Sequence, residues 1–271
     1  GMKTYGLIGE NLSHSFSQKY FQQKFYNEKI KDCQYLNFEI NNISTLRELI
    51  RKNAIQGLNI TIPYKKKVIP FLDEITKDAK KVGAVNTIQI KDSKLIGHNT
   101  DIFGFEKSIT PLLNGRNSAI ILGNGGVSKA IQFVLLKKGI SFNVFSRNLM
   151  LKFSDITVEN IQTHGLIINA TPLGMYPNNE TFPELPYNAI NSQHLLYDLV
   201  YNPEESQFLK KGRRMGAQIK NGIQMLNLQE TALMIQKIRF FEEALDDLFE
   251  NGVISGTYHR CIGQEATAVG I

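Results

Sequence analysis

Two charged side chains, Lys65 and Asp101, are the residues whose possible chemistry is easiest to define. Lys65 follows the run Gly-Leu-Asn-Ile-Thr-Ile-Pro-Tyr at 57 to 64, and Asp101 closes the run Asn-Thr-Asp at 99 to 101. Each comes directly after a predicted strand. A lysine and an aspartate that face each other form a pair able to transfer protons. A surface ion pair, worth about 0 to 1 kcal/mol, has the same residue types, and spacing alone does not choose between the two.

The strand before Lys65 is predicted to have one apolar and one polar face. Leu58, Ile60 and Ile62 alternate with Asn59 and Thr61, and the proline after Ile62 is expected to end the strand because it lacks a backbone donor. Polar groups at the end of a strand often hold a small polar ligand in an α/β protein. A strand that simply ends at the surface has the same pattern, so both interpretations stay open.

Hydroxyl groups are dense near the N-terminus, in the run Ser13-His14-Ser15-Phe16-Ser17. Aromatic residues then follow at helical spacing, so Ser13 or Ser15 is a natural N-cap for a helix. The same hydroxyls could instead bond the hydroxyl or carboxylate groups of a ligand, and helix N-termini favour anions. The two interpretations are compatible with each other.

A glycine-rich turn, Gly-Asn-Gly-Gly-Val-Ser at 123 to 128, follows an apolar strand predicted at 119–122. A helical pattern then leads to a second strand at 142–145. Strand, glycine loop, helix and strand within about 30 residues form the context in which this motif binds a dinucleotide. Gly123 allows the tight turn, Gly125 lets the backbone approach a pyrophosphate, and the helix N-terminus supplies amide donors. The alternative is a plain strand-to-helix turn.

The residues after the strand at 142–145 bear on the choice between NAD and NADP. An NAD-binding loop usually carries an acidic residue there for the ribose hydroxyls, whereas this chain has Ser146, Arg147 and Asn148. A guanidinium suits a 2′-phosphate, so the sequence favours NADP. The alternative is a solvated surface arginine, and Lys152 is near enough in sequence to share the charge.

These residues must be positioned by strands and helices, which alternate in the first part of the chain. The order strand, helix, strand, helix, strand is predicted at 4–8, 16–25, 34–40, 44–53 and 57–62. Ser44 is the predicted cap of the second helix. This alternation indicates a parallel sheet with right-handed crossovers. A hairpin is predicted next, with strands at 85–90 and 95–98.

The later part of the chain is predicted to contain a second domain. A turn-rich segment at 111–117 marks the first crossing into it. Strands with the loops that follow them are predicted at 166–170 with 171–177, 195–200 with 201–203, and 217–220. The two loops are expected to line one cofactor crevice, because they begin at strand ends. Gly222 then opens a long helix from which Gln229 projects.

Composition limits the classes of function. The chain has 271 residues, of which 42% are hydrophobic, and a formal net charge of +6. No run reaches the roughly 18 apolar residues of a membrane helix and no signal pattern is present, so a soluble, cytoplasmic protein without a membrane partner is expected. The basic residues are scattered, which disfavours a nucleic-acid partner and favours steering of a small anion. Neither Cys33 nor Cys261 has metal-type spacing, so no metal is expected.

Several collinear motifs resemble those of the shikimate dehydrogenases. They are Leu-Ser-His-Ser at 12–15, Asn-Ile-Thr-Ile-Pro-Tyr-Lys at 59–65, Gly-Ala-Val-Asn-Thr at 83–87, Asn-Thr-Asp at 99–101, the glycine loop, Asn-Ala-Thr-Pro-Leu-Gly-Met at 169–175 and Asn-Gly-Ile-Gln-Met-Leu at 221–226. The resemblance covers roughly residues 3 to 235. It implies an oxidoreductase of the shikimate pathway, and hence of aromatic amino acid biosynthesis, that reversibly reduces 3-dehydroshikimate to shikimate with NADPH.

The resemblance also implies the fold and its division. The fold is α/β, with an N-terminal α/β substrate domain, a Rossmann-like dinucleotide-binding domain and a cleft between them. The substrate domain would comprise residues 1–101 and 222–250, and the NADP-binding domain residues 102–221. Residues 251–271 would form a C-terminal tail of unclear role, and the protein would be a monomer or a homodimer.

Site residues are carried over position by position from the same resemblance. The residues at substrate-binding positions are Ser13, Ser15, Asn59, Thr61, Lys65, Asn86, Asp101, Tyr201 and Gln229. The residues at cofactor-binding positions are Gly123, Gly125, Gly126, Val127, Ser146, Arg147, Asn148, Thr171, Met175 and Gly222. Lys65 and Asp101 are the implied catalytic pair, because reduction of a ring ketone leaves an alkoxide that needs a proton and a nearby cation.

Two alternatives stay open. One is a quinate or quinate/shikimate dehydrogenase that uses NAD; the other is a non-catalytic nucleotide-sensing or ligand-sensing module on the same scaffold. Retention of both Lys65 and Asp101 argues against a sensor. Residues 254–266 look like a short segment of the thiamine-diphosphate-dependent 2-oxo acid dehydrogenases, but the Gly-Asp-Gly motif is missing, so residues 236–271 receive no assigned role.

Overall fold

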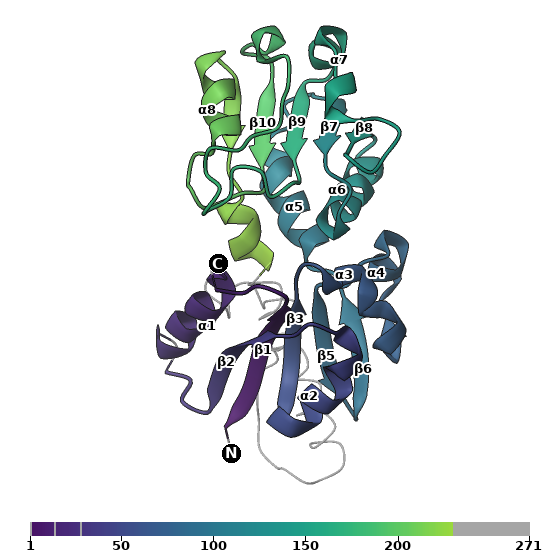
Figure 1. Cartoon of the computed structure of the whole chain (residues 1–271), viewed down its shortest axis with the longest axis vertical. Helices are drawn as coiled ribbons and strands as arrows, with labels where there is room; N and C mark the ends of the chain where they lie inside the picture. Colours follow the sequence, from purple (N-terminus) through teal and green to yellow (C-terminus); the bar gives the residue numbers. More distant parts are fainter. Residues whose placement is uncertain (1, 14, 28, 230–271) are drawn as a thin grey trace, which may run out of the picture.

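Two β-sheets form the framework of the protein. The computed structural model describes residues 2–13, 15–27 and 29–229. One sheet has six strands and the other has five, and each lies in its own half of the molecule (Figure 1). The predicted α/β fold with a second, Rossmann-like unit is confirmed. The expected span 222–250 continues past the described residues, and the predicted tail at 251–271 lies outside them.

The six-stranded sheet has the order β2-β1-β3-β5-β6-β4. Its strands are β1 (Lys3–Gly9), β2 (Cys33–Glu39), β3 (Ile55–Ile60), β4 (Glu74–Ile75), β5 (Thr87–Lys91) and β6 (Lys94–His98). Strand β1 pairs in parallel with β2 and β3, as predicted from the alternation of strands and helices. Strands β5 and β6 form the predicted antiparallel hairpin, whose turn residues Asp92 and Ser93 both have positive φ, as this tight turn requires.

The five-stranded sheet is wholly parallel, in the order β11-β10-β9-β7-β8. Its strands are β7 (Ser118–Leu122), β8 (Ser141–Phe145), β9 (Leu166–Asn169), β10 (Leu195–Asp198) and β11 (Gln218–Lys220). The strand order reverses between β7 and β9, which is where ligands bind in open α/β sheets. The carboxyl ends of β7, β9 and β10 point toward the other sheet (Figure 1).

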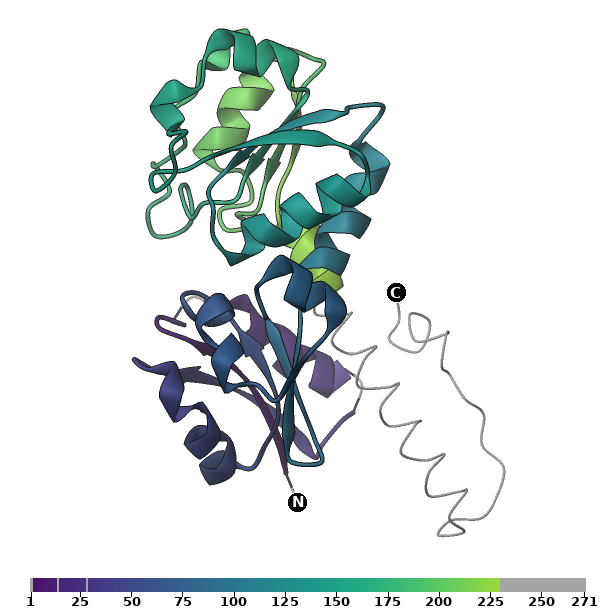
Figure 2. The same ribbon diagram turned by 90° about the vertical axis from the view of Figure 1, so that its right-hand side faces the viewer.

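Helices cover both faces of each sheet. They are α1 (Phe16–Asn27), α2 (Leu46–Asn53), α3 (Tyr64–Lys67), α4 (Lys77–Val82), α5 (Asp101–Ile109), α6 (Gly126–Lys137), α7 (Val158–Thr163) and α8 (Gln207–Arg214), with short 3₁₀ turns at Ile43–Thr45, Ile69–Phe71, Thr110–Leu112, Phe153–Asp155 and Tyr187–Ala189. Helix α5 and the helical residues 223–229 lie between the two sheets (Figure 2). The chain therefore crosses between the halves on two helical segments.

Each sheet has an apolar core on both of its faces. In β7, Ile120 and Leu122 pack on the side of α7 and α8, whereas Ala119 and Ile121 pack on the side of α5 and α6. Successive residues of a strand point to opposite faces, so a strand covered on both sides is a continuous apolar run. This is why the segment 119–122 is readable as a buried strand from sequence alone.

Two local predictions were wrong. Strand β3 ends at Ile60, and Ile62 lies beyond it with 69% of its surface exposed, so Ile62 does not continue the apolar face of Leu58 and Ile60. Ser44 does not cap α2; it lies inside a 3₁₀ turn that Asn42 caps by accepting from the backbone N–H of Ser44. In both places the regular element is shorter than predicted at one end, since β3 ends at Ile60 and α2 begins at Leu46. Across the described residues, no helix combines the length and apolar character that crossing a membrane requires.

Candidate active site

Lys65 and Asp101 form an ion pair. Nζ of Lys65 donates to Oδ2 of Asp101 over 2.7 Å. Lys65 belongs to α3 and Asp101 is the first residue of α5, so the pair connects two separate segments of the chain. The Asp101 side chain is 2% exposed and that of Lys65 is 16% exposed. A solvated surface ion pair, the alternative left open by the sequence, is therefore excluded.

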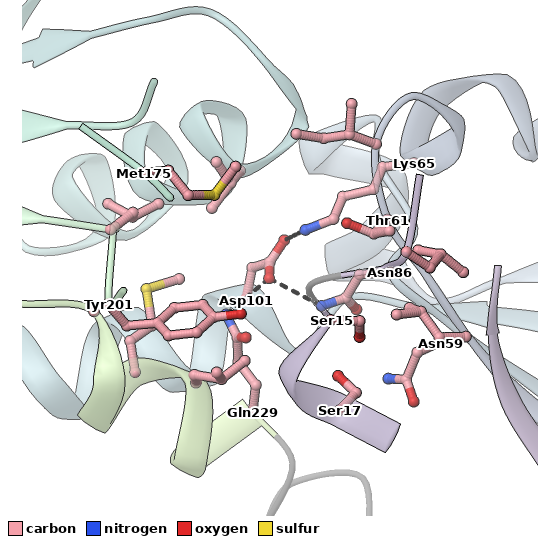
Figure 3. A pocket seen from close by; sticks show the side chains of 18 of the residues that line it. Ser15, Ser17, Asn59, Thr61, Lys65, Asn86, Asp101, Met175, Tyr201 and Gln229 are labelled. Carbon is pink, nitrogen blue, oxygen red and sulfur yellow. Dashed lines mark hydrogen bonds and ion pairs between the residues drawn. The ribbon is translucent and has the colours of Figure 1, made fainter. Parts of the chain in front are cut away.

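Two carboxamides hold the other oxygen of Asp101 (Figure 3). Nδ2 of Asn86 donates to Oδ1 of Asp101 over 3.0 Å, and Nε2 of Gln229 donates to the same oxygen over 2.8 Å. Asn86 is fixed in turn by Thr100, whose hydroxyl accepts from Nδ2 and whose backbone N–H donates to Oδ1. Because both of its oxygens have partners, the carboxylate of Asp101 keeps one orientation toward Lys65.

A glycine explains how Gln229 reaches Asp101. Residues 223–229 cross α5 at Gly104, where a Cβ atom would lie 2.6 Å from the carbonyl oxygen of Met225 and 2.7 Å from Cγ of Gln229. Any side chain at position 104 would push the crossing segment away from α5. The missing side chain therefore brings Gln229 within hydrogen-bond distance of Asp101.

Helix α5 is anchored to the five-stranded sheet by Tyr197 of β10. Its ring meets that of Phe105 edge-on at 5.4 Å, and its hydroxyl lies 2.6 Å from Oγ of Ser108. Burial raises the pKa of Tyr197, so the phenol stays neutral and serves as a hydrogen-bonding group. These contacts fix the helix whose first residue is Asp101.

The ion pair lies in a pocket of about 470 Å³ between the two halves of the molecule. This size suits a small ligand. The residues at predicted substrate positions that line it are Ser15, Asn59, Thr61, Lys65, Asn86, Asp101, Tyr201 and Gln229. The hydroxyl of Tyr35 donates to Oδ1 of Asn59 over 2.7 Å and fixes that carboxamide. Ser13 is not part of the lining, because its side chain is exposed and its hydroxyl donates to Oδ1 of Asn11.

The glycine loop lies between β7 and α6. Gly123 has a φ of 103°, a conformation that favours glycine, and a Cβ there would lie 3.0 Å from the carbonyl oxygen of Ala170. A Cβ on Gly125 would meet nothing within 4 Å, so the backbone is open to an approaching ligand at the N-terminus of α6. Oδ1 of Asn124 is buried and has no partner in the described part of the chain. The turn at Gly123 and the open backbone at Gly125 fit a loop that binds pyrophosphate.

The same loop contacts the lysine of the ion pair. A Cβ on Gly126 would lie 3.2 Å from Cβ and 3.4 Å from Cδ of Lys65. The predicted nucleotide loop therefore lies beside the aliphatic part of the Lys65 side chain, across the boundary between the two halves. Val127, the next residue, lines the pocket, as do Met175 and Gly222 among the predicted cofactor residues.

The remaining predicted cofactor residues lie on loops outside the pocket lining. Ser146 is buried, and its backbone N–H and C=O bond Leu151 and Leu149, which closes a turn after β8. Arg147 and Asn148 are exposed on that turn. Within residues 2–13, 15–27 and 29–229, no acidic side chain forms an ion pair with Arg147, so its guanidinium is available to an anion. Thr171 lies after β9, where its hydroxyl donates to Oδ1 of Asn169 over 2.6 Å.

Known proteins similar to this chain share its fold and much of its sequence. Residues 7–88 match the family model described as the shikimate dehydrogenase substrate binding domain. The shikimate dehydrogenase (NADP(+)) of Clostridium beijerinckii is 41% identical over 239 residues, which cover 83% of this chain and 88% of that one. The chain belongs to the shikimate dehydrogenase family. The family resemblance seen in the sequence motifs is thus confirmed.

Solved structures of shikimate dehydrogenases have the same fold. Shikimate dehydrogenase 1 from Peptoclostridium difficile superimposes with a TM-score of 0.75 at 37% identity, covering 85% of this chain and 89% of its own. A shikimate dehydrogenase solved in complex with NADP+ superimposes with a TM-score of 0.75 at 32% identity, covering 85% of this chain and 88% of its own.

Some lining residues of this shikimate dehydrogenase family member were missed from the sequence. Ser17 lines the pocket and is buried, although only Ser13 and Ser15 were predicted from the same run of hydroxyls. Tyr176 and Pro177 line it from the loop after β9. That loop was expected to line the cofactor crevice, but these two residues were not named. The signal for Ser17 is helical spacing, because Ser17 lies one turn before Phe21, which is fully buried.

Proposed function

We propose that this chain is an NADP-dependent shikimate dehydrogenase that reversibly reduces 3-dehydroshikimate to shikimate in the shikimate pathway. The observation that carries the proposal is the buried ion pair of Lys65 and Asp101 in a pocket bounded by the glycine loop. A proton-transfer pair beside a dinucleotide loop suits an oxidoreductase that acts on a ring hydroxyl group. Family relatives named for shikimate and NADP support the substrate and the cofactor.

In this proposal Lys65 handles the proton of the reaction. The bound cofactor supplies the hydride, and the carbonyl oxygen of the substrate then needs a proton. Nζ of Lys65 projects into the pocket and donates that proton, and takes it back in the reverse direction. Asp101 keeps Nζ in place through the 2.7 Å bond. A positioned group of this kind contributes about 10² to 10⁴ in rate.

The polar residues of the six-stranded half bind the substrate in this proposal. Asn59, Thr61, Asn86 and Ser15 offer amides and hydroxyls to its hydroxyl groups, and Tyr201 and Gln229 close the site from the other side. We assign Ser13 a place beside the substrate on the basis of the resemblance alone, since its hydroxyl bonds Asn11 here.

The cofactor is proposed to lie along the carboxyl ends of β7, β8 and β9. Gly123, Gly125 and Gly126 with the N-terminus of α6 would hold the pyrophosphate, and the turn at Ser146, Arg147 and Asn148 would hold the 2′-phosphate. Thr171, Met175, Val127 and Gly222 would contact the nicotinamide end, because three of them line the pocket that contains Lys65.

The test is a panel of initial rates that crosses shikimate and quinate with NADP and NAD. The highest kcat/KM is expected for shikimate with NADP. A higher value for quinate, or for NAD, would replace the proposal by the quinate alternative, which the relatives support no better. Binding of both ligands without any turnover would instead indicate a sensing module.

The division into residues 1–101 with 222–250, and 102–221, belongs to the proposal as well. It rests on the two sheets and on the two helical crossings, α5 and residues 223–229. A cytoplasmic location and a monomeric or homodimeric state are expected with it. Light scattering at known protein concentration distinguishes the two oligomeric states.

A further inference from the structure

A second buried aspartate, Asp198, lies beneath the opposite wall of the pocket. It ends β10 and is fully buried, with 0% of its surface exposed. Its partner in the parallel register is Asn169, the last residue of β9, which is equally buried. Neither residue lines the pocket. Two polar side chains are thus enclosed where the two strands end and the pocket wall begins.

Three donors converge on the carboxylate of Asp198. Oδ1 accepts from Nδ2 of Asn169 over 2.9 Å and from the backbone N–H of Val200 over 3.0 Å. Oδ2 accepts from the hydroxyl of Ser206, the N-cap residue of α8. The carboxylate therefore joins the ends of two strands to the start of a helix.

Asn169 connects Asp198 to the loop after β9. Its Oδ1 accepts from the backbone N–H of Thr171 over 3.1 Å and from the hydroxyl of Thr171 over 2.6 Å. Its Nδ2 also donates to the carbonyl oxygen of Leu173 over 3.3 Å. The bond to Asp198 decides which side of the carboxamide carries the nitrogen, so Asp198 sets the orientation in which Asn169 can hold the loop.

Val200 connects Asp198 to the loop after β10, because its backbone N–H donates to the carboxylate. Residues 199, 201 and 202 line the pocket, and the carbonyl oxygen of Asn202 accepts from the backbone N–H of Tyr176 over 2.9 Å. The two loops are therefore bonded to each other through Tyr176 and Asn202. Where they leave their strands, they are held by Asp198, one through Asn169 and the other through Val200. The wall residues Met175, Tyr176, Pro177, Leu199, Tyr201 and Asn202 all lie on these loops.

We propose that Asp198 is a positioning residue that holds the cofactor-side wall of the pocket in its binding shape, acting through Asn169 and Val200. The inference rests on the proposed function, because it assumes that Thr171 and Met175 contact the cofactor. It adds a residue that contacts neither substrate nor cofactor.

The chemistry of the carboxyl group agrees with this role. Burial raises the pKa of Asp198 to about 7, and the hydrogen bonds from Ser206, Val200 and Asn169 oppose the rise. In the protonated acid, Oδ2 can donate to Ser206 while Oδ1 still accepts from the other two donors. Asparagine has the same layout as the protonated acid, so Asp198→Asn is expected to keep the loops in place.

The test compares NADPH affinity in three variants. Asp198→Ala removes the acceptor of Asn169, Asp198→Asn keeps it, and Leu196→Ala removes a fully buried side chain two residues earlier on the same face of β10. NADPH binding is followed by the emission of the nicotinamide itself, since the chain has no tryptophan. Melting temperature, kcat and shikimate affinity are measured on the same samples.

Asp198→Ala is expected to weaken NADPH binding by about tenfold, a loss that matches a hydrogen bond to a charged group. Asp198→Asn is expected to bind close to wild type, and Leu196→Ala to melt earlier with unchanged NADPH affinity. Shikimate affinity should change little in all three, because most of the predicted substrate contacts lie in the other half.

Unchanged NADPH affinity in Asp198→Ala, or an equal loss in Leu196→Ala, would overturn the proposal in favour of a purely structural acid. Equal losses in Asp198→Ala and Asp198→Asn would also overturn it. If Asp198→Ala does not fold, Asn169→Ala cuts the same connection and the same outcomes apply. A wild type that binds NADPH without shikimate turnover would contradict the proposed function and leave the affinity comparison intact.

Discussion

Two buried aspartates, Asp101 and Asp198, differ in their partners and in their position relative to the pocket. Asp101 faces the pocket and is paired with a cation, Lys65, and with two carboxamides. Asp198 lies behind the pocket, and its carboxylate accepts from a hydroxyl, a carboxamide and a backbone N–H. A buried carboxylate paired with a lysine can take part in proton transfer, whereas one with neutral donors can hold backbone in place.

The difference indicates that the two walls of the pocket have different roles. The wall of the six-stranded half offers side chains that face the pocket, and two of them, Asn86 and Asn59, are fixed by Thr100 and Tyr35. The wall of the five-stranded half offers loops whose shape depends on polar groups buried beneath them. Substitutions in the first wall should therefore change the rate of the reaction, and substitutions in the second should change cofactor binding or stability.

The largest effect is expected for Lys65→Ala. Loss of the proton donor should lower kcat by about 10² to 10⁴ while the dissociation constant of shikimate changes little. Lys66→Ala is the matched control, because Lys66 is the exposed neighbour on the same helix. A near-normal kcat with a raised KM would assign Lys65 to binding and would break the division between the walls.

A pH series on Asp198 should show the next largest effect, in stability. Because burial raises the pKa of Asp198 from 3.8 to about 7, the folded state binds a proton that the unfolded state releases between these values. The free energy of unfolding should fall as pH rises through this window, by on the order of 4 kcal/mol, relative to Asp198→Asn, which cannot titrate. Urea unfolding of both proteins from pH 4 to 8 measures the difference. Parallel curves would show that Asp198 does not titrate in this range.

A smaller effect is expected for Arg147→Ala, in the choice of cofactor. Charge-assisted bonds from arginine to a phosphate are worth roughly 1.5 to 3 kcal/mol, so the KM for NADP should rise about tenfold to a hundredfold. The KM for NAD should barely change, because NAD lacks the 2′-phosphate. Lys152 is close in sequence and could reduce the loss, so Lys152→Ala and the double variant are measured as well. Equal losses for both cofactors would contradict the assignment.

No effect on catalysis is expected from deletion of residues 252–271. These residues lie outside the described part of the chain and beyond the family motifs, and the described lining of the pocket extends to Gln229. Shikimate turnover of the truncated protein should match that of the full chain. A truncated protein that stays folded but loses turnover would show that the tail contributes to the site or to an active oligomer.

Much of the site could be predicted from sequence where local pattern decides position. The glycine loop and the ends of the parallel strands are encoded in consecutive residues, so the placement of Lys65, Asp101 and Gly123 was readable. The contact of Gln229 with Asp101 was not, because it depends on a helix crossing that Gly104 permits between segments far apart in the chain. Family resemblance supplied Gln229 without its partner. Ile62 was misplaced because the strand ends two residues before the apolar alternation does.

The burial of Asp198 could not be predicted from the sequence. Asp198 interrupts the apolar run 195–200, and an acidic residue there is not expected to be buried, because a lone charge is costly to bury. Its burial becomes intelligible only when Asn169, Val200 and Ser206 are brought together by the pairing of β9 with β10 and by the start of α8.

The most direct test of the division between the walls is the double variant Lys65→Ala/Arg147→Ala, assayed for kcat and for the KM of NADP. The two side chains lie in different halves and have no shared partner in the described chain, so their effects should add. The double variant is predicted to have the kcat of Lys65→Ala and the NADP KM of Arg147→Ala. If instead both constants of the double variant equal those of Lys65→Ala, or both equal those of Arg147→Ala, the two substitutions are not independent. That result would show that the two walls act as one unit, and would contradict the account.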